Sequence, residues 1–336
     1  MFVNIDPYTK FIRLWLVTIF LLIIVIIVVG GLTRLTDSGL SITQWELFKG
    51  VLPPLNSEKW NFYFNEYKKI PEYQEINFNM TLNEFKVIYY WEYFHRLIAR
   101  LIGLFSIIPL IFLYFKFKNQ LKQNLKYFLI FGLVCFQGFL GWFMVKSGLV
   151  ENINISHYRL ALHLSVALII LAFTFWFILE SLKIIKFVTK IDNKFLTLFF
   201  IIVIIQIILG ALLAGLNGGL LFNSWPDMNG NFFPDDVSYH DLYKTNLLNN
   251  PSIIQFFHRL MGYLLIIFLI ILNYYYYNLK IEIRSILFLN LAVFFQIILG
   301  ILTLLTGVNI FYASLHQLGS VFVLTSFLFI YYKNTN

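Results

Sequence analysis

The sequence has few charged residues and a single cysteine. Charged residues make up 12% of the 336 residues, whereas 59% are hydrophobic. This balance excludes a soluble globular domain, because folding cannot hide that much apolar surface from water. The lone cysteine, Cys135, excludes a disulfide and a cysteine-based metal site, and we interpret it as a small core residue. The net charge of +8 resides largely in short loops, which predicts a membrane topology and no nucleic-acid partner.

Eight apolar segments are long enough to cross a membrane, at about 20 residues each. A spanning segment that satisfies all of its own backbone hydrogen bonds is a helix. The sequence therefore predicts an all-α, polytopic membrane protein. The predicted spans are 14–33, 92–115, 127–146, 158–179, 195–216, 255–277, 284–305 and 311–332.

The distribution of charge among the loops predicts the orientation. Lysine and arginine gather before the first span, in every second loop and after the last span, which is typical of cytoplasmic segments. The other long loops are not basic: residues 34–86 hold six Lys/Arg and seven Asp/Glu, and residues 217–254 hold one Lys and four Asp. Both termini are therefore expected in the cytoplasm. The long first loop either covers the outer mouth of a site or forms a docking surface.

The chain contains an internal repeat. The sequence Phe94-His95-Arg96-Leu97 recurs as Phe257-His258-Arg259-Leu260, and the segment from Gly30 to Trp45 matches the segment from Gly210 to Trp225 at an offset of 180. The offset shortens further along the chain because the loops differ in length. We predict two repeated four-helix bundles with parallel topology, an N-terminal domain over 1–180 and a C-terminal domain over 181–336.

Each predicted repeat carries two histidines within its apolar segments. They are His95 and His163 in the first repeat, and His258 and His316 in the second. An ionisable side chain inside a membrane helix is costly and usually functional, although a single one is equally often a hydrogen-bonded core residue. Four histidines in two related pairs, all near the outer ends of their helices, favour metal-centred cofactors. Zinc or copper needs further ligands, whereas haem needs only one or two axial histidines and an apolar slot.

Five arginines near the predicted histidine level are candidates for pairing with haem propionates. The alternative is interfacial charge that simply extends into the lipid headgroups. Propionate pairing is favoured for the two arginines that follow histidines in both repeats. The candidates are Arg34, Arg96, Arg100, Arg159 and Arg259.

The two repeats differ at one chemically important position. Glu92 lies three residues before His95, whereas Gln255 lies three residues before His258. The i, i+3 spacing places Glu92 and His95 on one helical face. A carboxylate there can transfer protons or stabilise developing positive charge. The alternative is an ion pair with Arg96 or Arg100, or a favourable charge at a helix N-terminus. We interpret the first repeat as the reactive one.

Taken together, these motifs resemble the heme A synthase family, in its mitochondrial and alphaproteobacterial branch. The resemblance rests on Glu92-Tyr93-Phe94-His95-Arg96, on Gly30 through Thr36 with Ser38-Gly39-Leu40 and Trp45, and on Phe257 through Leu260. It covers essentially the whole chain. The family's Gram-positive branch has a cysteine pair in its outer loops, which this sequence lacks.

The resemblance implies a bacterial inner-membrane enzyme that converts haem O to haem A for cytochrome oxidase by oxidising the C8 methyl of the porphyrin to a formyl group. It implies that His95 and His163 flank the substrate haem, that His258 and His316 ligate a resident haem b, and that Glu92 is the essential carboxylate. The implied partners are a haem O synthase and an electron donor, either ferredoxin-like or quinol. Whether the chain forms a homo-oligomer is left open.

Two other classes of function compete with this interpretation. A di-haem electron-transfer protein that oxidises quinol usually places two histidines on one helix, about four turns apart, whereas each predicted helix here carries one. A transporter with repeated halves would be expected to have broken helices and polar residues at the membrane midplane, whereas the polar residues here gather toward the outer face.

Overall fold

The computed structural model describes residues 6–46, 49–118, 121–149 and 155–335, and these residues form helices with one isolated β-bridge. Eight of the helices are long and apolar enough to cross a membrane, which confirms the predicted all-α, multi-pass class. These helices are α1 (Pro7–Leu35), α4 (Leu82–Lys116), α5 (Leu121–Gly148), α6 (His157–Leu182), α7 (Asn193–Gly215), α8 (Pro251–Asn278), α9 (Arg284–Leu305) and α10 (Ile310–Asn334).

Several of the long helices begin before their apolar stretch, because capping residues start them. The side chain of Asp6 caps α1 by accepting a hydrogen bond from the backbone of Thr9, and Pro7 occupies the first helical turn. Helix α4 begins ten residues before its predicted span, at a capping box in which Thr81 and Glu84 bond each other's backbone N–H groups. Consequently the first three turns of α4 precede the predicted membrane segment.

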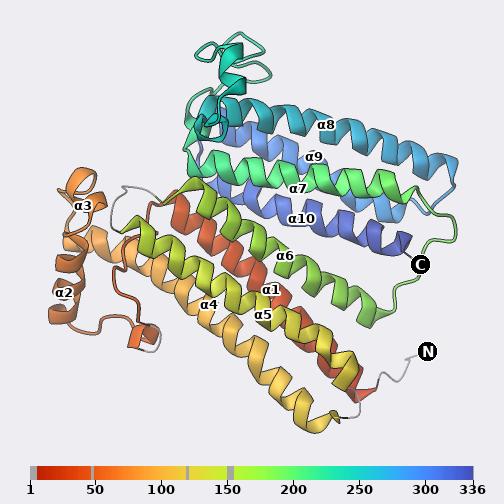
Figure 1. The fold of residues 1–336 in the computed structure, drawn as a ribbon, viewed down its shortest axis with the longest axis horizontal. Coiled ribbons are helices and arrows are strands. Elements are labelled where there is room, and N and C mark those ends of the chain that lie inside the picture. The colour runs from red at the N-terminus through yellow and green to blue at the C-terminus, as the bar shows by residue number, and fades with distance from the viewer. Residues whose placement is uncertain (1–5, 47–48, 119–120, 150–154, 336) are drawn as a thin grey trace. The chain divides into compact units, whose positions relative to one another are not determined.

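The chain divides into two compact units, Met1–Thr174 and Phe175–Asn336. In unit 1, α4 packs against both α1 and α5, and Figure 1 shows these three helices side by side. The indole N–H of Trp15 in α1 donates to the carbonyl of Phe105 in α4 at 2.7 Å. In unit 2, α7 packs on α8 and α9 packs on α10. Asn273 of α8 and Asn290 of α9 exchange two amide hydrogen bonds of 2.8 and 2.9 Å.

The segment between α1 and α4 is folded and packs on the first turns of α4. It contains η1 (Lys49–Val51), α2 (Ser57–Tyr67) and α3 (Pro71–Glu75). Its buried side chains join those of α4 in one largely aromatic cluster, made of Leu40, Ile42, Trp60, Phe64, Tyr67, Ile70, Phe85, Tyr89 and Tyr93. We call this the outer cluster. It explains why α4 extends beyond the predicted span, since Phe85 and Tyr89 are buried there.

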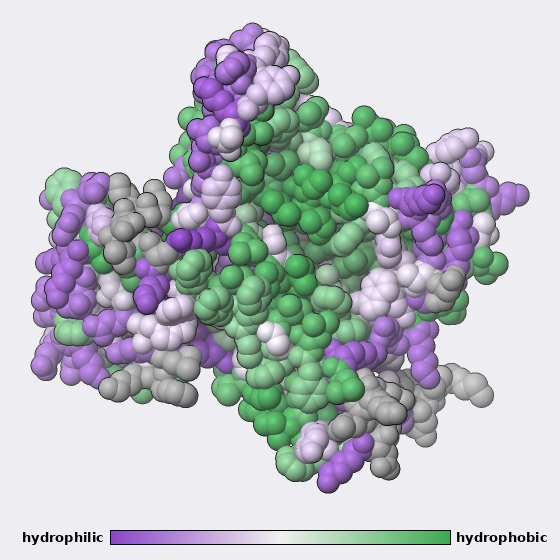
Figure 2. Space-filling view, in the orientation of Figure 1, coloured by the Kyte–Doolittle hydropathy of each residue, from purple (hydrophilic) through white to green (hydrophobic). Residues whose placement is uncertain are grey.

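The corresponding segment of unit 2 contains three 3-10 turns, η3 (Gly218–Leu220), η4 (Tyr239–Tyr243) and η5 (Leu247–Asn249), and the isolated β-bridge between Met228 and Asn231. Figure 2 shows hydrophobic residues over the sides of the long helices and hydrophilic residues over the segment that carries α2 and α3. Cys135 in α5 is exposed, so its interpretation as a core residue is wrong. The apolar run around it reflects contact with lipid, which apolar side chains cover as readily as a core.

Candidate functional site

The four histidines lie in two pairs, one in each unit. In unit 1, the ring centroids of His95 in α4 and His163 in α6 are 6.5 Å apart. In unit 2, those of His258 in α8 and His316 in α10 are 6.4 Å apart. The two units therefore hold their imidazoles at nearly the same separation. Among the residues that the structure describes, no group of three or more His, Cys, Asp or Glu side chains could hold a metal ion, so each pair offers two imidazoles.

Each histidine packs against a glycine of the preceding long helix of its unit. A Cβ atom added at that glycine would approach Cε1 of the imidazole to 3.2 Å or less, closer than ordinary van der Waals contact. The distances are 2.9 Å for Gly30 and His95, 3.2 Å for Gly141 and His163, 3.0 Å for Gly210 and His258, and 2.9 Å for Gly300 and His316. The absence of a side chain at these glycines therefore makes the room in which the imidazoles lie.

The residues of both pairs fit a haem: at centroid separations of 6.5 and 6.4 Å, the two imidazoles of a pair would be close enough to hold one haem group together. In addition, Nδ1 of His95, His163 and His258 is buried without a hydrogen-bond partner among the described residues. Unpaired buried polar atoms are rare in folded proteins and are consistent with a site that binds a further group. Two imidazoles in an apolar helical bundle are the donor set that haem takes.

The carboxylate of Glu92 is buried and fully hydrogen-bonded. Its side chain forms an ion pair of 2.5 Å with Arg96, one turn further along α4. Its other oxygen accepts hydrogen bonds from the hydroxyl of Ser41 at 2.7 Å and from the backbone N–H of Ile42 at 2.8 Å. The sequence allowed an ion pair with Arg96, and the structure contains it. The bonds to Ser41 and Ile42 were not foreseen, and they tie the segment that follows α1 to α4.

Arg96 and Arg259 hold matching stretches of backbone. Arg96 donates to the carbonyl oxygen of Ile42 at 2.9 Å, and Arg259 donates to that of Phe222 at 2.9 Å. Ile42 and Phe222 are 180 residues apart, the same offset that relates the two repeats. Arg259 also donates to the carbonyl oxygen of Asp227 at 2.6 Å. Both guanidinium groups therefore anchor the segments outside the long helices.

The other three arginines each contact a different group. Arg34 forms an ion pair of 2.9 Å with Asp37. Arg100 donates to the carbonyl oxygen of Glu46 at 2.8 Å. The guanidinium of Arg159 lies 4.7 Å from the ring centroid of Phe143, a cation–π contact between α6 and α5.

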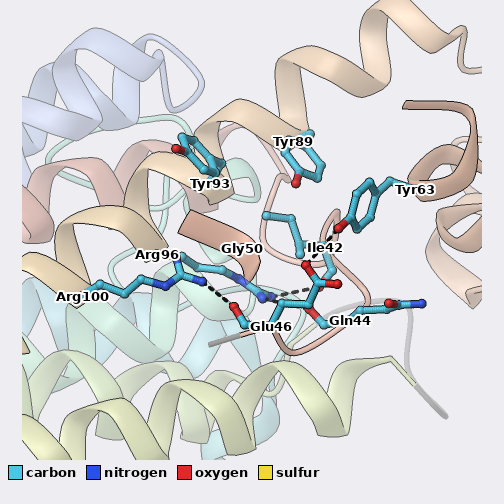
Figure 3. Close-up of a pocket in the computed structure, with 9 residues that line it drawn as sticks. All are labelled: Ile42, Gln44, Glu46, Gly50, Tyr63, Tyr89, Tyr93, Arg96 and Arg100. Carbon is cyan, nitrogen blue, oxygen red and sulfur yellow. Dashed lines mark hydrogen bonds between the residues drawn. The ribbon is translucent and has the colours of Figure 1, made fainter. Parts of the chain in front are cut away.

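A small polar pocket lies beside Arg96, on the side of the outer cluster. Figure 3 shows Arg96 and Arg100 reaching from α4 toward the segment that carries Gln44 and Glu46. The hydroxyl of Tyr63 in α2 donates to Glu46 at 2.9 Å, and burial, followed by this hydrogen bond, raises the pKa of Tyr63 to about 12. The pocket is lined by Ile42, Gln44, Glu46, Gly50, Tyr63, Tyr89, Tyr93, Arg96 and Arg100.

Fold and site together define a multi-pass membrane protein whose long helices carry two histidine pairs. Glu92 lies three residues before His95 of the first pair, and Gln255 lies three residues before His258 of the second. The chain matches the family model described as Cytochrome oxidase assembly protein over residues 13–328. It is 60% identical over 336 residues to the Heme A synthase of Pelagibacter ubique (strain HTCC1062), with 100% of each chain covered. It is 41% identical over 325 residues to the Heme A synthase of Rickettsia bellii (strain OSU 85-389), covering 94% of this chain and 96% of that protein. The chain belongs to the cytochrome oxidase assembly protein family.

Proposed function

We propose that this chain is a heme A synthase that oxidises the C8 methyl of haem O to a formyl group, through successive hydroxylations, and so supplies haem A for the assembly of cytochrome oxidase. Full-length relatives named Heme A synthase support the activity. The observation in the structure that carries it is the asymmetry of the two histidine pairs. Glu92 is buried on the helix of His95, and Gln255 takes its place on the helix of His258.

In this proposal the two pairs have different tasks. His258 and His316 hold a resident haem b, and His95 and His163 flank the haem O substrate. When bound, a haem iron supplies redox chemistry that no protein side chain offers. The chain's own contribution is to bind and orient the substrate in an apolar, helical slot and to exclude water from it. The domains expected at 1–180 and 181–336 then correspond to a substrate half and a resident half.

Glu92 is proposed as the residue that acts in the reaction. Its carboxylate is held by Ser41, Ile42 and Arg96, so its position is fixed before substrate binds. A fixed carboxylate on the face of His95 can accept a proton or stabilise positive charge that develops near it. The bonds of Arg96 and Arg259 to loop backbone favour an anchoring role for these two. Arg34, Arg100 and Arg159 remain candidates for the propionates.

We further propose a location in a bacterial inner membrane, with both termini in the cytoplasm and the histidine pairs toward the periplasm. The support is the charge of the loops, since the basic segments alternate with the two long, acidic ones. The proposed partners are a haem O synthase that delivers the substrate and an electron donor that is ferredoxin-like or a quinol. A di-haem quinol-oxidising protein is not favoured, because each helix carries one ligand.

The test is the haem content of the purified, full-length protein after expression with a source of haem O. Acid-acetone extraction and reverse-phase chromatography separate haem b, haem O and haem A. We expect haem b together with haem O, a hydroxylated intermediate or haem A. Haem b alone, with no conversion of added haem O, would contradict the proposed activity, and no haem at all would overturn the assignment of all four histidines.

A further inference from the structure

The two exposed tryptophans of this chain occupy equivalent positions in the two repeats. All seven tryptophans lie in the described part of the chain, and of these only Trp45 and Trp225 are exposed, at 52% and 45%. They are 180 residues apart, the offset that relates the segments after α1 and α7. We call residues 42–46 and 222–226, which contain them, the outer straps. Because a tryptophan in water leaves a large apolar surface uncovered, two matched exposures indicate a contact that both units make.

In unit 1, hydrogen bonds from α4 hold the strap on both sides of its tryptophan. Arg96 donates to the carbonyl oxygen of Gln44 at 3.4 Å, and Arg100 donates to that of Glu46 at 2.8 Å. Figure 3 shows both arginines reaching from α4 to these two residues. The guanidinium of Arg96 also lies 5.7 Å from the ring centroid of Trp45. The position of Trp45 is therefore set by bonds to the backbone before and after it.

In unit 2, hydrogen bonds from α8 hold the matching carbonyl groups. Arg259 donates to the carbonyl oxygen of Ser224 at 3.0 Å, and the hydroxyl of Tyr263 donates to that of Pro226 at 3.4 Å. Tyr263 takes the place of the second arginine of unit 1, since both follow the first arginine of their helix by four residues. The residue that holds the strap thus differs between the units, whereas the tryptophan and its bonded neighbours are kept.

The straps hold their tryptophans at the level where the membrane spans begin. Arg96 and Arg259 each lie one helical turn inside the predicted start of their spans, and the tryptophans lie beside them. Tryptophan is enriched at this level of membrane proteins, because its apolar body enters the acyl chains while its N–H stays among polar groups. Arg96 directly follows His95, and Arg259 directly follows His258. Each strap therefore ties the depth of a tryptophan to the depth of a histidine.

We propose that Trp45 and Trp225 insert into the headgroup region of the lipid bilayer and fix the depth of the two histidine pairs. A lipid surface fits better than a protein partner, because both units present a tryptophan in the same way although only unit 1 carries Glu92. The long helices continue the apolar surface, since Phe94 of α4 is 48% exposed and Leu260 of α8 is 40% exposed. This role goes beyond the proposed function and does not depend on it.

The test uses the full-length protein, labelled with fluorotryptophan and placed in lipid nanodiscs. Trp45→Phe and Trp225→Phe assign the two fluorine resonances. Three paramagnetic probes are added in turn: a lipid with a nitroxide near its headgroup, a lipid with a nitroxide at the end of its acyl chain, and a water-soluble gadolinium chelate. We expect the nitroxide near the headgroup to broaden both resonances most. Trp15, which is 4% exposed, is the control and should be broadened less by this probe.

The other outcomes would overturn the proposal. Stronger broadening by the gadolinium chelate would show that the indoles face water, as the surface that docks a protein partner would. Broadening by none of the probes would show that the rest of the molecule covers them. Lipid contact of only one of the two tryptophans would contradict the role that the repeats share.

Two substitutions of Arg100 test whether the strap presents the tryptophan. Arg100→Met removes the hydrogen bond to the carbonyl of Glu46, whereas Arg100→Tyr introduces the residue type that unit 2 has at this position. We expect the nitroxide near the headgroup to broaden the Trp45 resonance less in Arg100→Met and as in the wild type in Arg100→Tyr. The Trp225 resonance should be unchanged in both variants, which shows that unit 2 is intact. Equal broadening of the Trp45 resonance in the two variants would contradict the role of this bond.

Discussion

The hydroxyl of Ser41 donates a hydrogen bond of 2.7 Å to the carboxylate of Glu92, although the two residues are 51 positions apart. This bond joins the segment after α1 to α4 directly beside the ion pair between Glu92 and Arg96. In unit 2, Gln255 instead donates to the backbone carbonyl of Phe222 at 3.2 Å. The two units thus use different side chains at the matching position to hold the segment that precedes the helix: a carboxylate in unit 1 and an amide in unit 2. A carboxylate suits unit 1 because the groups that face it there are all donors.

Replacing Glu92 with glutamine is expected to abolish haem A formation while both haem sites stay filled. The charge is lost, but an amide of this size is already accommodated at Gln255. Arg96, whose side chain is 13% exposed, loses its ion-pair partner, which typically costs about 3–5 kcal/mol for a buried pair, so thermal unfolding in detergent should also occur at lower temperature. The measurement is extraction of haems from the purified variant. A yield of haem A near that of the wild type would rule out the catalytic role of Glu92.

Replacing Ser41 with alanine tests whether Glu92 serves to hold the segment after α1 in place or to act in the reaction. The carboxylate keeps its charge, its bond to the N–H of Ile42 and its ion pair with Arg96, and it loses one hydrogen bond from a neutral donor. We expect a stability loss of about 1–2 kcal/mol and a haem A yield that is reduced but measurable. Thermal unfolding and haem extraction check both. If Ser41→Ala is as inactive as Glu92→Gln, then Glu92 serves mainly to hold the segment in place.

The sequence predicts the membrane-spanning helices but not where their first turns begin. Apolar runs longer than 18 residues predict spans because the membrane leaves few alternatives. Hydropathy does not register capping, so the start of α4 at Leu82 was missed, although Thr81 and Glu84 form a recognisable capping box. Hydropathy likewise does not predict the start of α1 at Pro7, which is capped by Asp6. The sequence predicts a loop where α2 and α3 form, because the aromatic residues of this segment show no long apolar period.

The histidine pairs could be anticipated from the repeat, whereas their supporting residues could not. The repeat pairs Gly30 with Gly210, but only packing shows that Gly30 faces His95 and that Gly210 faces His258. The hydrogen bonds of Arg96 and Arg259 depend on the backbone path of the segments after α1 and α7, and no periodicity of the sequence predicts that path.

Alanine at a glycine that faces a histidine should displace the imidazole and weaken haem binding. A Cβ at Gly210 would lie 3.0 Å from Cε1 of His258, and overpacking of this kind typically costs about 1–3 kcal/mol. We expect Gly210→Ala to retain haem b poorly in purified protein. Gly138→Ala is the matched control, since a Cβ at Gly138 meets nothing within 4 Å. Equal haem b content in the two variants would show that His258 does not depend on this contact.

A buried acid, Glu72, is hydrogen-bonded to a tyrosine of the outer cluster, and its titration should make the segment that carries α2 and α3 sensitive to pH. Glu72 of α3 is 6% exposed and accepts a hydrogen bond of 2.7 Å from the hydroxyl of Tyr67. Burial raises the pKa of Glu72 from its ordinary value of 4.5 to about 7, and the hydrogen bond from Tyr67 only partly offsets this. The folded segment therefore binds the proton more tightly than the unfolded one. Its stability is fully present below about pH 4.5 and is lost as the pH rises through about 7.

Glu72→Gln should remove this pH dependence, because glutamine keeps an acceptor for Tyr67 and has no charge to bury. In the wild type, the free energy of opening of residues 57–77 is expected to fall by up to roughly 3 kcal/mol between pH 5 and pH 8, the linkage value of a shift of this size. Hydrogen exchange of the backbone, corrected for its intrinsic pH dependence, measures this quantity. Glu72→Gln should give the same opening free energy at both pH values. A wild-type segment that is more stable at pH 8 than at pH 5 would contradict this prediction, because it would mean that the folded segment favours the ionised form of Glu72. The first residue to examine would then be Asn77, which donates a hydrogen bond of 2.8 Å to the hydroxyl of Tyr67.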